Sequence, residues 1–348
     1  MKKSISLDLL GGKNMDQVQG LADYIKWIEY RERLGLPRKV TEEYRMLGQG
    51  EYNRNYLFIH PVTGKKLILR VNFGSQMHLE NQIEYEFRAL ELLKDSGRTP
   101  RPLYVDGTKE KIPYGVMVME YLPGHALDYE KELLYAADCL ADIHSIPVGR
   151  EPPLIAPDNP LKAILEECEE MFRKYEESGL GDEENKRKIR RLLERGWKKA
   201  DILPKVTYCC CINTELNSTN FLINGEGKGN YLIDWEKPVY GDPAQDLGHF
   251  LAPTTTFWKT DVILEREQMD QFIKAYIKKA ADRFDTQGLK ERISTYIPIT
   301  CLRGITWCAM AWVEYQQPGK EIFNESTAHK LEAYLSHGFL DKIAEYVG

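Results

Sequence analysis

Two polar side chains fourteen positions apart, Asn220 and Asp234, limit the fold of this chain more than any other feature. Each lies at an end of a short, mainly apolar segment, residues 221–224 and 230–234. Such a pair of segments indicates a β-hairpin, with the two polar groups at its mouth. Amide and carboxylate oxygens are ligands that magnesium accepts while it keeps several of its waters. The pattern therefore predicts a hairpin with a metal site.

The order of the remaining segments predicts two lobes of different character. Strand-like patterns fill residues 43–73 and 114–121, and a helical pattern lies between them at 79–95. After residue 128 the apolar positions follow a mainly helical spacing, so we expect an α+β fold. The expected parts are an accessory helix in 1–40 (periodic over 15–37), a small sheet lobe in 41–122 and a large lobe in 123–348. Within the large lobe we expect helices at 128–147, 160–178 and 182–200, a region with the hairpin at 206–250 and a helical region at 256–348.

Composition narrows the class of protein. The 348 residues are 43% hydrophobic, which is enough for a buried core and about two domains. The net charge of −6 and the lack of a long basic stretch argue against nucleic acid as a partner. No apolar run reaches the roughly 18 residues of a membrane span, and the first residues are too polar for a secretory signal. With seven cysteines and no Cys-x-x-Cys pair, we expect reduced thiols in a cytoplasmic protein.

The first lobe carries residues that suit phosphate binding. Gly48 and Gly50 lie between two predicted strands and would let the backbone approach phosphates, although a plain hairpin turn is the better explanation of the pair taken alone. Arg70 ends an apolar strand one hairpin later and is the candidate phosphate cation, whereas a lone charge at such a place usually points to solvent. Glu86, on the inward side of the next helix, is the expected partner of Arg70. Glu84 is its rival on another helix face.

Three further motifs allow a comparison with known sequences. They are Met117-Val-Met-Glu120-Tyr-Leu-Pro-Gly124, Leu140-Ala-Asp-Ile-His144-Ser-Ile-Pro147, and Asp234-Trp-Glu236 followed by Gly241-Asp-Pro-x-x-Asp246-Leu. Together with the hairpin they resemble the aminoglycoside phosphotransferase and choline/ethanolamine kinase family, a branch of the protein-kinase-like fold. The resemblance covers residues from about 43 to about 255.

This resemblance implies a bilobal kinase-like fold that uses ATP and Mg²⁺, although ATP is not distinguished from GTP. By analogy with the family, Asn220 and Asp234 are the magnesium ligands, and Asp246 braces the catalytic loop. The hinge between the lobes would hold adenine through backbone groups of Met119, Glu120, Tyr121 and Leu122.

The catalytic loop departs from the family pattern, His-x-Asp-Leu-x-x-x-x-Asn. This chain reads Asn213-Thr-Glu215-Leu-Asn-Ser-Thr-Asn220, with asparagine in place of histidine and glutamate in place of aspartate. The carboxylate of Glu215 can still orient a hydroxyl, but a displacement of about 1 Å can cost roughly a hundredfold in rate. Asn213 can donate and accept hydrogen bonds as a loop brace.

Three interpretations follow from these substitutions. The protein is a working kinase adapted to glutamate, a slow or altered phosphotransferase, or a nucleotide-binding pseudokinase with a regulatory or binding role. The joint presence of metal ligands, phosphate cation and acidic motif favours activity. We therefore expect ATP-dependent, magnesium-assisted phosphorylation of a hydroxyl on a small molecule.

Candidate substrate contacts lie near the C-terminus. Trp307, Met310 and Glu314 share one face of a predicted helix, and Trp258 and Asp261 are looser candidates. A tryptophan beside a glutamate can hold an ammonium group, but an aromatic stripe at helical spacing is also what ordinary helix packing produces. The identity of the acceptor, among aminoglycosides, choline, sugars, nucleosides and other small alcohols, stays open.

Overall fold

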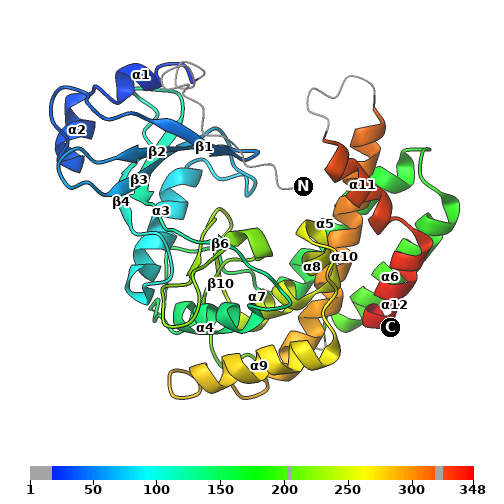
Figure 1. The fold of residues 1–348 in the computed structure, drawn as a ribbon. Coiled ribbons are helices and arrows are strands. Elements are labelled where there is room, and N and C mark those ends of the chain that lie inside the picture. Colours follow the sequence, from blue (N-terminus) through cyan, green and yellow to red (C-terminus); the bar gives the residue numbers. More distant parts are fainter. Residues whose placement is uncertain (1–17, 150, 202–204, 318–323) are drawn as a thin grey trace, which may run out of the picture. The chain divides into compact units, whose positions relative to one another are not determined.

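The computed structural model describes residues 18–149, 151–201, 205–317 and 324–348. The chain forms two compact units (Figure 1). The first unit extends to Pro123 and also includes the five-residue segment Ile233–Lys237. The second unit consists of Gly124–Leu232 and Pro238–Gly348.

The first unit is built on an antiparallel sheet with the strand order β1-β2-β3-β5-β4. The sheet confirms the antiparallel, sheet-rich first part of the predicted α+β fold. Helix α3 begins after Asn81, whose side chain accepts the backbone N–H of Glu84 as an N-cap. The elements are β1 (Arg45–Gln49), β2 (Asn53–Ile59), β3 (Lys66–Asn72), α3 (Gln82–Leu93), β4 (Pro102–Asp106) and β5 (Gly115–Glu120).

The two faces of this sheet have different partners. Leu67, Leu69 and Val71 alternate along β3 toward a core rich in tyrosine. Because successive side chains of a strand point to opposite faces, Arg70 lies on the other face, where it meets Glu86 of α3. The alternation of side chains along β3 therefore places Arg70 on the face covered by α3, away from the tyrosine core.

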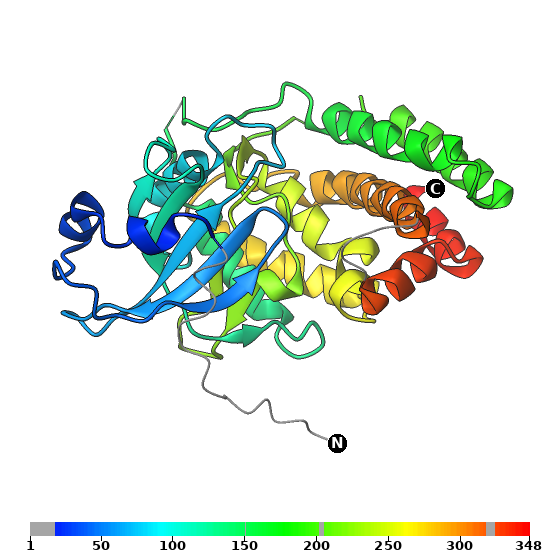
Figure 2. The same cartoon turned by 90° about the horizontal axis from the view of Figure 1, so that it is seen from above.

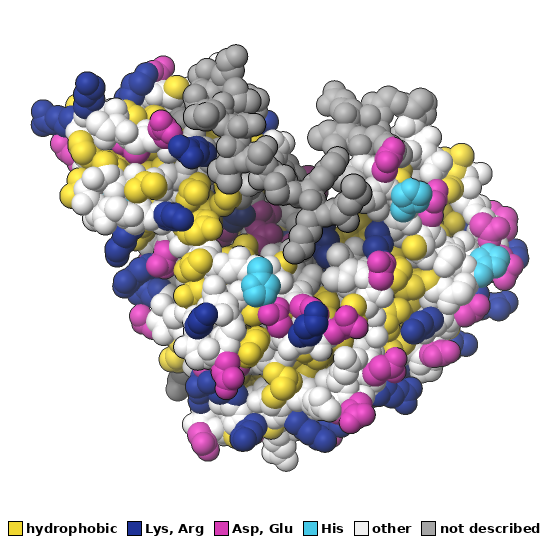
Figure 3. Space-filling view, in the orientation of Figure 1, with side chains coloured by type: hydrophobic (Ala, Val, Ile, Leu, Met, Phe, Trp, Pro, Cys, Tyr) yellow, Lys and Arg dark blue, Asp and Glu magenta, His cyan; other side chains and the backbone are white. Residues whose placement is uncertain are grey.

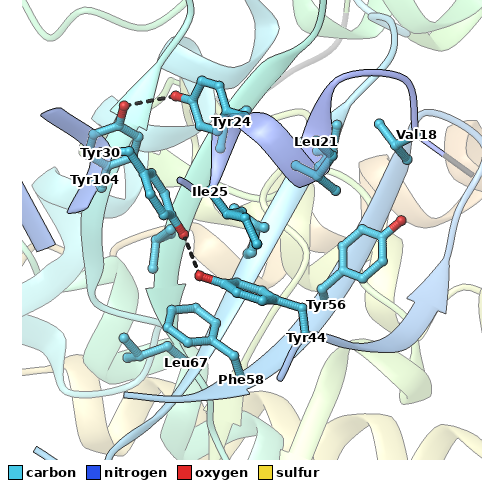
Figure 4. Close-up of a cluster of buried hydrophobic side chains, with 14 of the residues drawn as sticks. Val18, Leu21, Tyr24, Ile25, Tyr30, Tyr44, Tyr56, Phe58, Leu67 and Tyr104 are labelled. Atoms are coloured by element: carbon cyan, nitrogen blue, oxygen red, sulfur yellow. Dashed lines mark hydrogen bonds between the residues drawn. The ribbon is translucent and has the colours of Figure 1, made fainter. Parts of the chain in front are cut away.

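The tyrosine core is closed by the N-terminal segment, shown in Figure 4. The Tyr24 and Tyr104 hydroxyls lie 2.8 Å apart, and those of Tyr30 and Tyr44 lie 3.2 Å apart. Such pairs satisfy polar atoms that the rings carry into the core.

The predicted continuous helix over 15–37 is wrong for the described residues, and residues 15–17 lie outside them. The segment forms two short helices, α1 (Leu21–Tyr24) and α2 (Ile28–Leu34). The backbone is extended at Trp27, which separates the helices, and Gly35 ends α2 with φ +67°. Tertiary packing of the aromatic rings overrides the local periodicity here.

The second unit contains two small sheets and most of the helices. The predicted hairpin is confirmed, since β8 (Phe221–Ile223) pairs antiparallel with β9 (Tyr231–Leu232). β6 (His125–Ala126) adds to β8, and β7 (Cys210–Ile212) pairs with β10 (Val239–Gly241). The helices are α4 (Leu133–His144), α5 (Pro160–Glu177), α6 (Glu183–Lys199), α7 (Pro243–Leu251), α8 (Pro253–Lys259), α9 (Arg266–Ala280), α10 (Leu289–Gln316), α11 (Glu325–Tyr334) and α12 (His337–Val347).

Helix α10 organises the second unit. It packs along α5 and α7, and also contacts α6, α8, α11 and α12 (Figures 1 and 2). Gly304 allows this approach, because a Cβ at that position would lie 2.6 Å from the Cβ of Thr254 on α8. Residues of α10 are therefore brought close to α5 and α8, which are distant in sequence.

The surface matches the weak net charge of the chain. On the face seen in Figure 3, acidic and basic side chains are interspersed rather than gathered into one large patch of a single sign. Within the described ranges, no helix is both long enough and apolar enough to cross a membrane.

A buried ion pair joins α2 to the segment that leads into β1. Arg31 contacts Glu42 at 2.9 Å, and their side chains are 1% and 0% exposed. Arg31 also donates to the carbonyl oxygens of Ile25 and Pro37. Although burial opposes ionisation, hydrogen bonds from Arg31 and from backbone amides hold the pKa of Glu42 below its ordinary value.

We predict that Glu42→Gln lowers the free energy of unfolding of the first unit by about 3 kcal/mol, because the buried guanidinium loses its counter-charge. Hydrogen exchange of the β1–β3 amides, followed by mass spectrometry, measures this loss locally. In the wild type, the ionised Glu42 carboxylate contributes its full share of the free energy of unfolding above the unfolded-state pKa of about 4.3. This share is lost as the pH falls through the lower folded-state pKa.

The matched control for this prediction is Glu43→Gln. The Glu43 carboxylate pairs with Arg45 at 2.9 Å, but these side chains are 69% and 67% exposed. We expect a change of at most about 0.5 kcal/mol. Equal effects of the two substitutions would contradict a stabilising role for the buried pair.

Candidate active site

Arg70 is the centre of a charged cluster in the first unit. Its Nη1 donates to the Glu86 carboxylate, and its Nε donates to Asn55 Oδ1 at 3.2 Å. Its Nη2 lies 3.2 Å from both Asp234 Oδ1 and Glu236 Oε1. The Arg70 side chain is 6% exposed, whereas that of Asp234 is 45% exposed. The structure thus brings together three predicted residues, Arg70, Glu86 and Asp234.

Glu236 is a member of this cluster to which the sequence analysis assigned no role. Its carboxylate accepts from Asn53, and its backbone carbonyl accepts from Gln82 Nε2 at 2.7 Å. The available signal was that Glu236 belongs to the same motif as Asp234, two residues later. The partner positions, far away in sequence, gave no comparable signal.

The cluster places three carboxyl groups around one guanidinium. Burial and then the Asp234 carboxylate raise the pKa of Glu236 to about 8. Burial likewise raises the pKa of Glu86, whose Oε2 atom is buried without a hydrogen-bond partner among the described residues. Although burial opposes it, the surrounding carboxylates hold the pKa of Arg70 above its ordinary value. An additional cation beside the half-exposed Asp234 would reduce the electrostatic repulsion.

The backbone of Asp234 has an uncommon conformation. Its φ is +68°, in the left-handed region that few residues other than glycine adopt. Such strain, on the order of 1–3 kcal/mol, persists only where surrounding contacts impose it. The buried Trp235 and the contacts of Glu236 supply such anchors on the C-terminal side of Asp234.

The predicted catalytic loop lies in the second unit and is held by Asp246. Asp246 Oδ2 accepts the backbone N–H of Asn213, and Oδ1 accepts that of Thr214, both at 2.7 Å. His144 Nε2 lies 3.2 Å from Oδ2 and its Nδ1 lies 2.8 Å from the Tyr276 hydroxyl. A fully buried carboxylate thereby fixes the loop where Thr214 has φ +68°.

Inside the loop, the amides orient neighbouring groups. Asn213 is buried, and its Oδ1 accepts the backbone N–H of Glu215 at 3.1 Å. Asn220 Nδ2 donates to the Glu215 backbone carbonyl at 3.1 Å. With the nitrogen used in this way, the amide oxygen is the atom of the Asn220 side chain that could act as the predicted cation ligand. An amide oxygen and a carboxylate are a donor set that magnesium accepts, and it commonly uses only one or two protein ligands.

The side chain of Glu215 has a neighbour that sequence reasoning missed. Arg303 Nη2, on α10, lies 3.6 Å from Glu215 Oε1. The same guanidinium binds Glu167 of α5 through Nε at 2.9 Å and through Nη2 at 3.3 Å. No motif pointed to this contact, because the three residues come from separate elements.

The predicted glycine and hinge residues for cofactor binding lie in or next to strands β1 and β5 of the first unit. Gly48 lies in β1 and Gly50 directly after it, both with φ outside the left-handed range. A Cβ at Gly48 would meet no described atom within 4 Å, so the fold itself does not require glycine there. Met119 and Glu120 end β5, and Tyr121 and Leu122 follow. The N–H groups of Glu120 and Tyr121 donate to the carbonyls of Arg101 and Lys66.

The predicted substrate residues gather on α10 and α8. Ordinary helix packing would require this face of α10 to be buried. Instead, Trp307 is 38% exposed and Glu314 is exposed. The rings of Trp258 and Trp307 are perpendicular with centroids 5.1 Å apart, and Met310 is half-buried. Arg303 precedes Trp307 by one turn, so both belong to one helix face.

Comparison of the chain with known proteins identifies the family to which it belongs. A model of the phosphotransferase enzyme family matches residues 43–291, which is more than half of the chain. The chain belongs to this family. The match confirms the resemblance that the motifs indicated. No curated protein matches the sequence significantly.

Solved structures of other phosphotransferases share the fold. A choline kinase from Cryptosporidium parvum is 14% identical with a TM-score of 0.64, covering 94% of this chain and 96% of that one. A spectinomycin phosphotransferase in complex with ADP and spectinomycin is 15% identical, with a TM-score of 0.58 and coverage of 92% and 96%. An amicoumacin kinase in complex with AMP-PNP and Ca²⁺ is 13% identical, with a TM-score of 0.63 and coverage of 92% and 96%. The likeness confirms the expected kinase-like α+β fold.

We predict that Asp246→Asn loosens the catalytic loop of this phosphotransferase. An amide accepts at one atom only, so one buried N–H of residues 213–214 would face an NH₂ group, at a cost of about 2 kcal/mol. Hydrogen exchange of the peptide spanning 210–216 should become faster. Asp261→Asn is the control, since that side chain is 91% exposed. Unchanged exchange in the Asp246 variant would contradict the bracing role.

Proposed function

We propose that the protein is an ATP-dependent, magnesium-assisted phosphotransferase that acts on a hydroxyl group of a small molecule. The observation that carries this proposal is the position of the half-exposed Asp234 carboxylate beside the buried Arg70–Glu86 pair. Phosphoryl transfer needs little covalent chemistry from a protein beyond positioning and charge neutralisation. A fixed cation next to an accessible carboxylate supplies the polar groups for a metal–nucleotide complex.

The residues of the first unit have distinct roles in this proposal. Arg70 binds nucleotide phosphate oxygens, and Glu86 keeps its guanidinium oriented. Asp234 supplies a carboxylate ligand for magnesium, and Asn220 an amide ligand. Bound magnesium would neutralise charge on the phosphate oxygens. Gly48 in β1 and Gly50 directly after it carry no side chain, which suits close approach of the backbone to phosphates.

The loop of the second unit would act on the acceptor. Glu215 is 32% exposed, so an acceptor hydroxyl can reach its carboxylate, which would orient the hydroxyl and accept its proton. The buried Asp246 and Asn213 hold the backbone on which Glu215 is carried. The exposed Trp307 and Glu314 of α10 are suited to an acceptor that carries an ammonium group.

Nucleotide binding and turnover test this function directly. Thermal unfolding would be followed with ATP or GTP, each with and without Mg²⁺, and ADP release would then be screened against choline, ethanolamine, aminoglycosides, sugars and nucleosides. We expect nucleotide stabilisation that requires Mg²⁺ and ADP release with at least one alcohol. Tight metal-dependent binding without turnover on any acceptor, and without gain in Glu215→Asp, would instead indicate a pseudokinase.

We predict that Asp234→Asn abolishes the Mg²⁺-dependent part of nucleotide stabilisation, because a neutral amide binds the hard cation far less strongly than a carboxylate. The Tm of the protein without ligands should change by no more than a few degrees, as only one exposed partner of Arg70 is altered. The control Asp261→Asn should retain the full Mg²⁺ effect. An unchanged response in the Asp234 variant would rule out its role as a metal ligand.

A further inference from the structure

The Glu215 carboxylate shares one guanidinium with a second carboxylate. Arg303 binds both oxygens of Glu167 at 2.9 and 3.3 Å, and its Nη2 lies 3.6 Å from Glu215 Oε1. The Arg303 side chain is only 19% exposed. Burial opposes its charge, but Glu167 and then Glu215 hold the pKa of Arg303 above its ordinary value. The guanidinium is therefore a fixed charge beside the loop.

The two contacts of Arg303 differ in kind. The contacts to Glu167 have hydrogen-bond lengths, and a bidentate pair fixes the plane and direction of the guanidinium. The contact to Glu215 is longer than a hydrogen bond, so it attracts the carboxylate without a direct N–H···O bond. Glu167 thus holds Arg303 back from a tight pair with Glu215, and such a pair would compete with an acceptor hydroxyl.

The length of the Glu215 side chain makes this contact possible. Glutamate has one more rotatable bond than aspartate, so its carboxylate is less well placed by the backbone alone. Aspartate at the same backbone position is one methylene shorter and would hold its carboxylate farther from Arg303. A distant charged group on a rigid helix can supply the restraint that the longer side chain needs.

We propose that Arg303, oriented by Glu167, positions the Glu215 carboxylate and so compensates for glutamate in a loop where the family pattern has aspartate. This inference rests on the proposed function, in which Glu215 orients the attacking hydroxyl. Arg303 is a positioning residue in this scheme, since it acts through Glu215. The α5–α10 pair thereby links the catalytic loop to the helix face that carries Trp307.

A double-mutant cycle distinguishes positioning of the Glu215 carboxylate by Arg303 from a purely structural role of Arg303 in holding α5 against α10. The variants are Arg303→Met, Glu215→Asp and their combination, and the assay is ADP release from Mg·ATP with water as the acceptor. We expect Arg303→Met to lower kcat about 10- to 100-fold with KM for ATP within about twofold, and to cost less than about threefold in the Glu215→Asp background. Equal losses in both backgrounds would overturn the proposal.

Matched variants control for loss of a helix–helix ion pair. Arg190→Met removes the contact of Arg190 on α6 with Glu169 of α5, 2.7 Å in length, and should leave kcat within about twofold. Arg303→Lys keeps the charge but loses the bidentate geometry. Its kcat should therefore be about tenfold higher than that of Arg303→Met. A loss in Arg190→Met as large as that in Arg303→Met would attribute the effect to packing of α5.

Crystal structures of two variants test the positioning without any activity. In Arg303→Met the Glu215 carboxylate should leave its wild-type position, whereas in Glu167→Gln Arg303 should close on Glu215 to less than about 3.2 Å. If wild-type protein releases no ADP with water or with any alcohol of the screen, the proposed function fails, and these structures still decide the positioning. A Glu215 carboxylate that stays within about 0.5 Å of its place in Arg303→Met would overturn the inference.

Discussion

The predicted catalytic loop of the second unit depends on the hydrogen bonds that its backbone donates to the buried carboxylate of Asp246. This carboxylate accepts two consecutive backbone N–H groups and contacts the imidazole of His144 on α4. Buried carboxylates are costly unless their oxygens are satisfied, and here the loop amides provide that satisfaction. The loop conformation and the burial of Asp246 therefore stabilise each other. Glu215 directly follows the braced residues 213 and 214, and Asn213 Oδ1 and Asn220 Nδ2 bind its backbone N–H and carbonyl.

Arg70 has the corresponding role in the first unit. It lies on β3, the central strand, and the alternation of that strand directs it toward Glu86 of α3. The segment Ile233–Lys237 joins the same unit through Asp234 and Glu236, although its neighbours in sequence belong to the other unit. Ionic and hydrogen-bond contacts of this segment place the strained, half-exposed Asp234 beside the arginine. The three carboxyl groups around one guanidinium favour an additional cation beside Asp234.

Much of the fold was predictable because its signals are local. Helices α5 and α6 begin and end within a residue or two of the predicted ranges, since an amphipathic stripe and an N-cap residue define each of them. The hairpin of β8 and β9 was predictable for the same reason. Strands β6 and β10 are only two or three residues long, and they exist through pairing with distant partners. The break at Trp27 followed from aromatic packing that no local pattern contains.

The sequence by itself determined the family and the hairpin flanked by Asn220 and Asp234, because motif spacing and residue alternation are properties of contiguous chain. It also predicted Glu86 as the partner of Arg70, an ion pair that forms when α3 packs on the sheet. Only the tertiary structure decided that Glu236 joins the Arg70 cluster and that Arg303 and Glu167 stand beside Glu215. These contacts join residues on separate elements, and the energy that forms them comes from packing the elements together. Long-range contacts of this kind leave no periodicity in the chain from which they could be read.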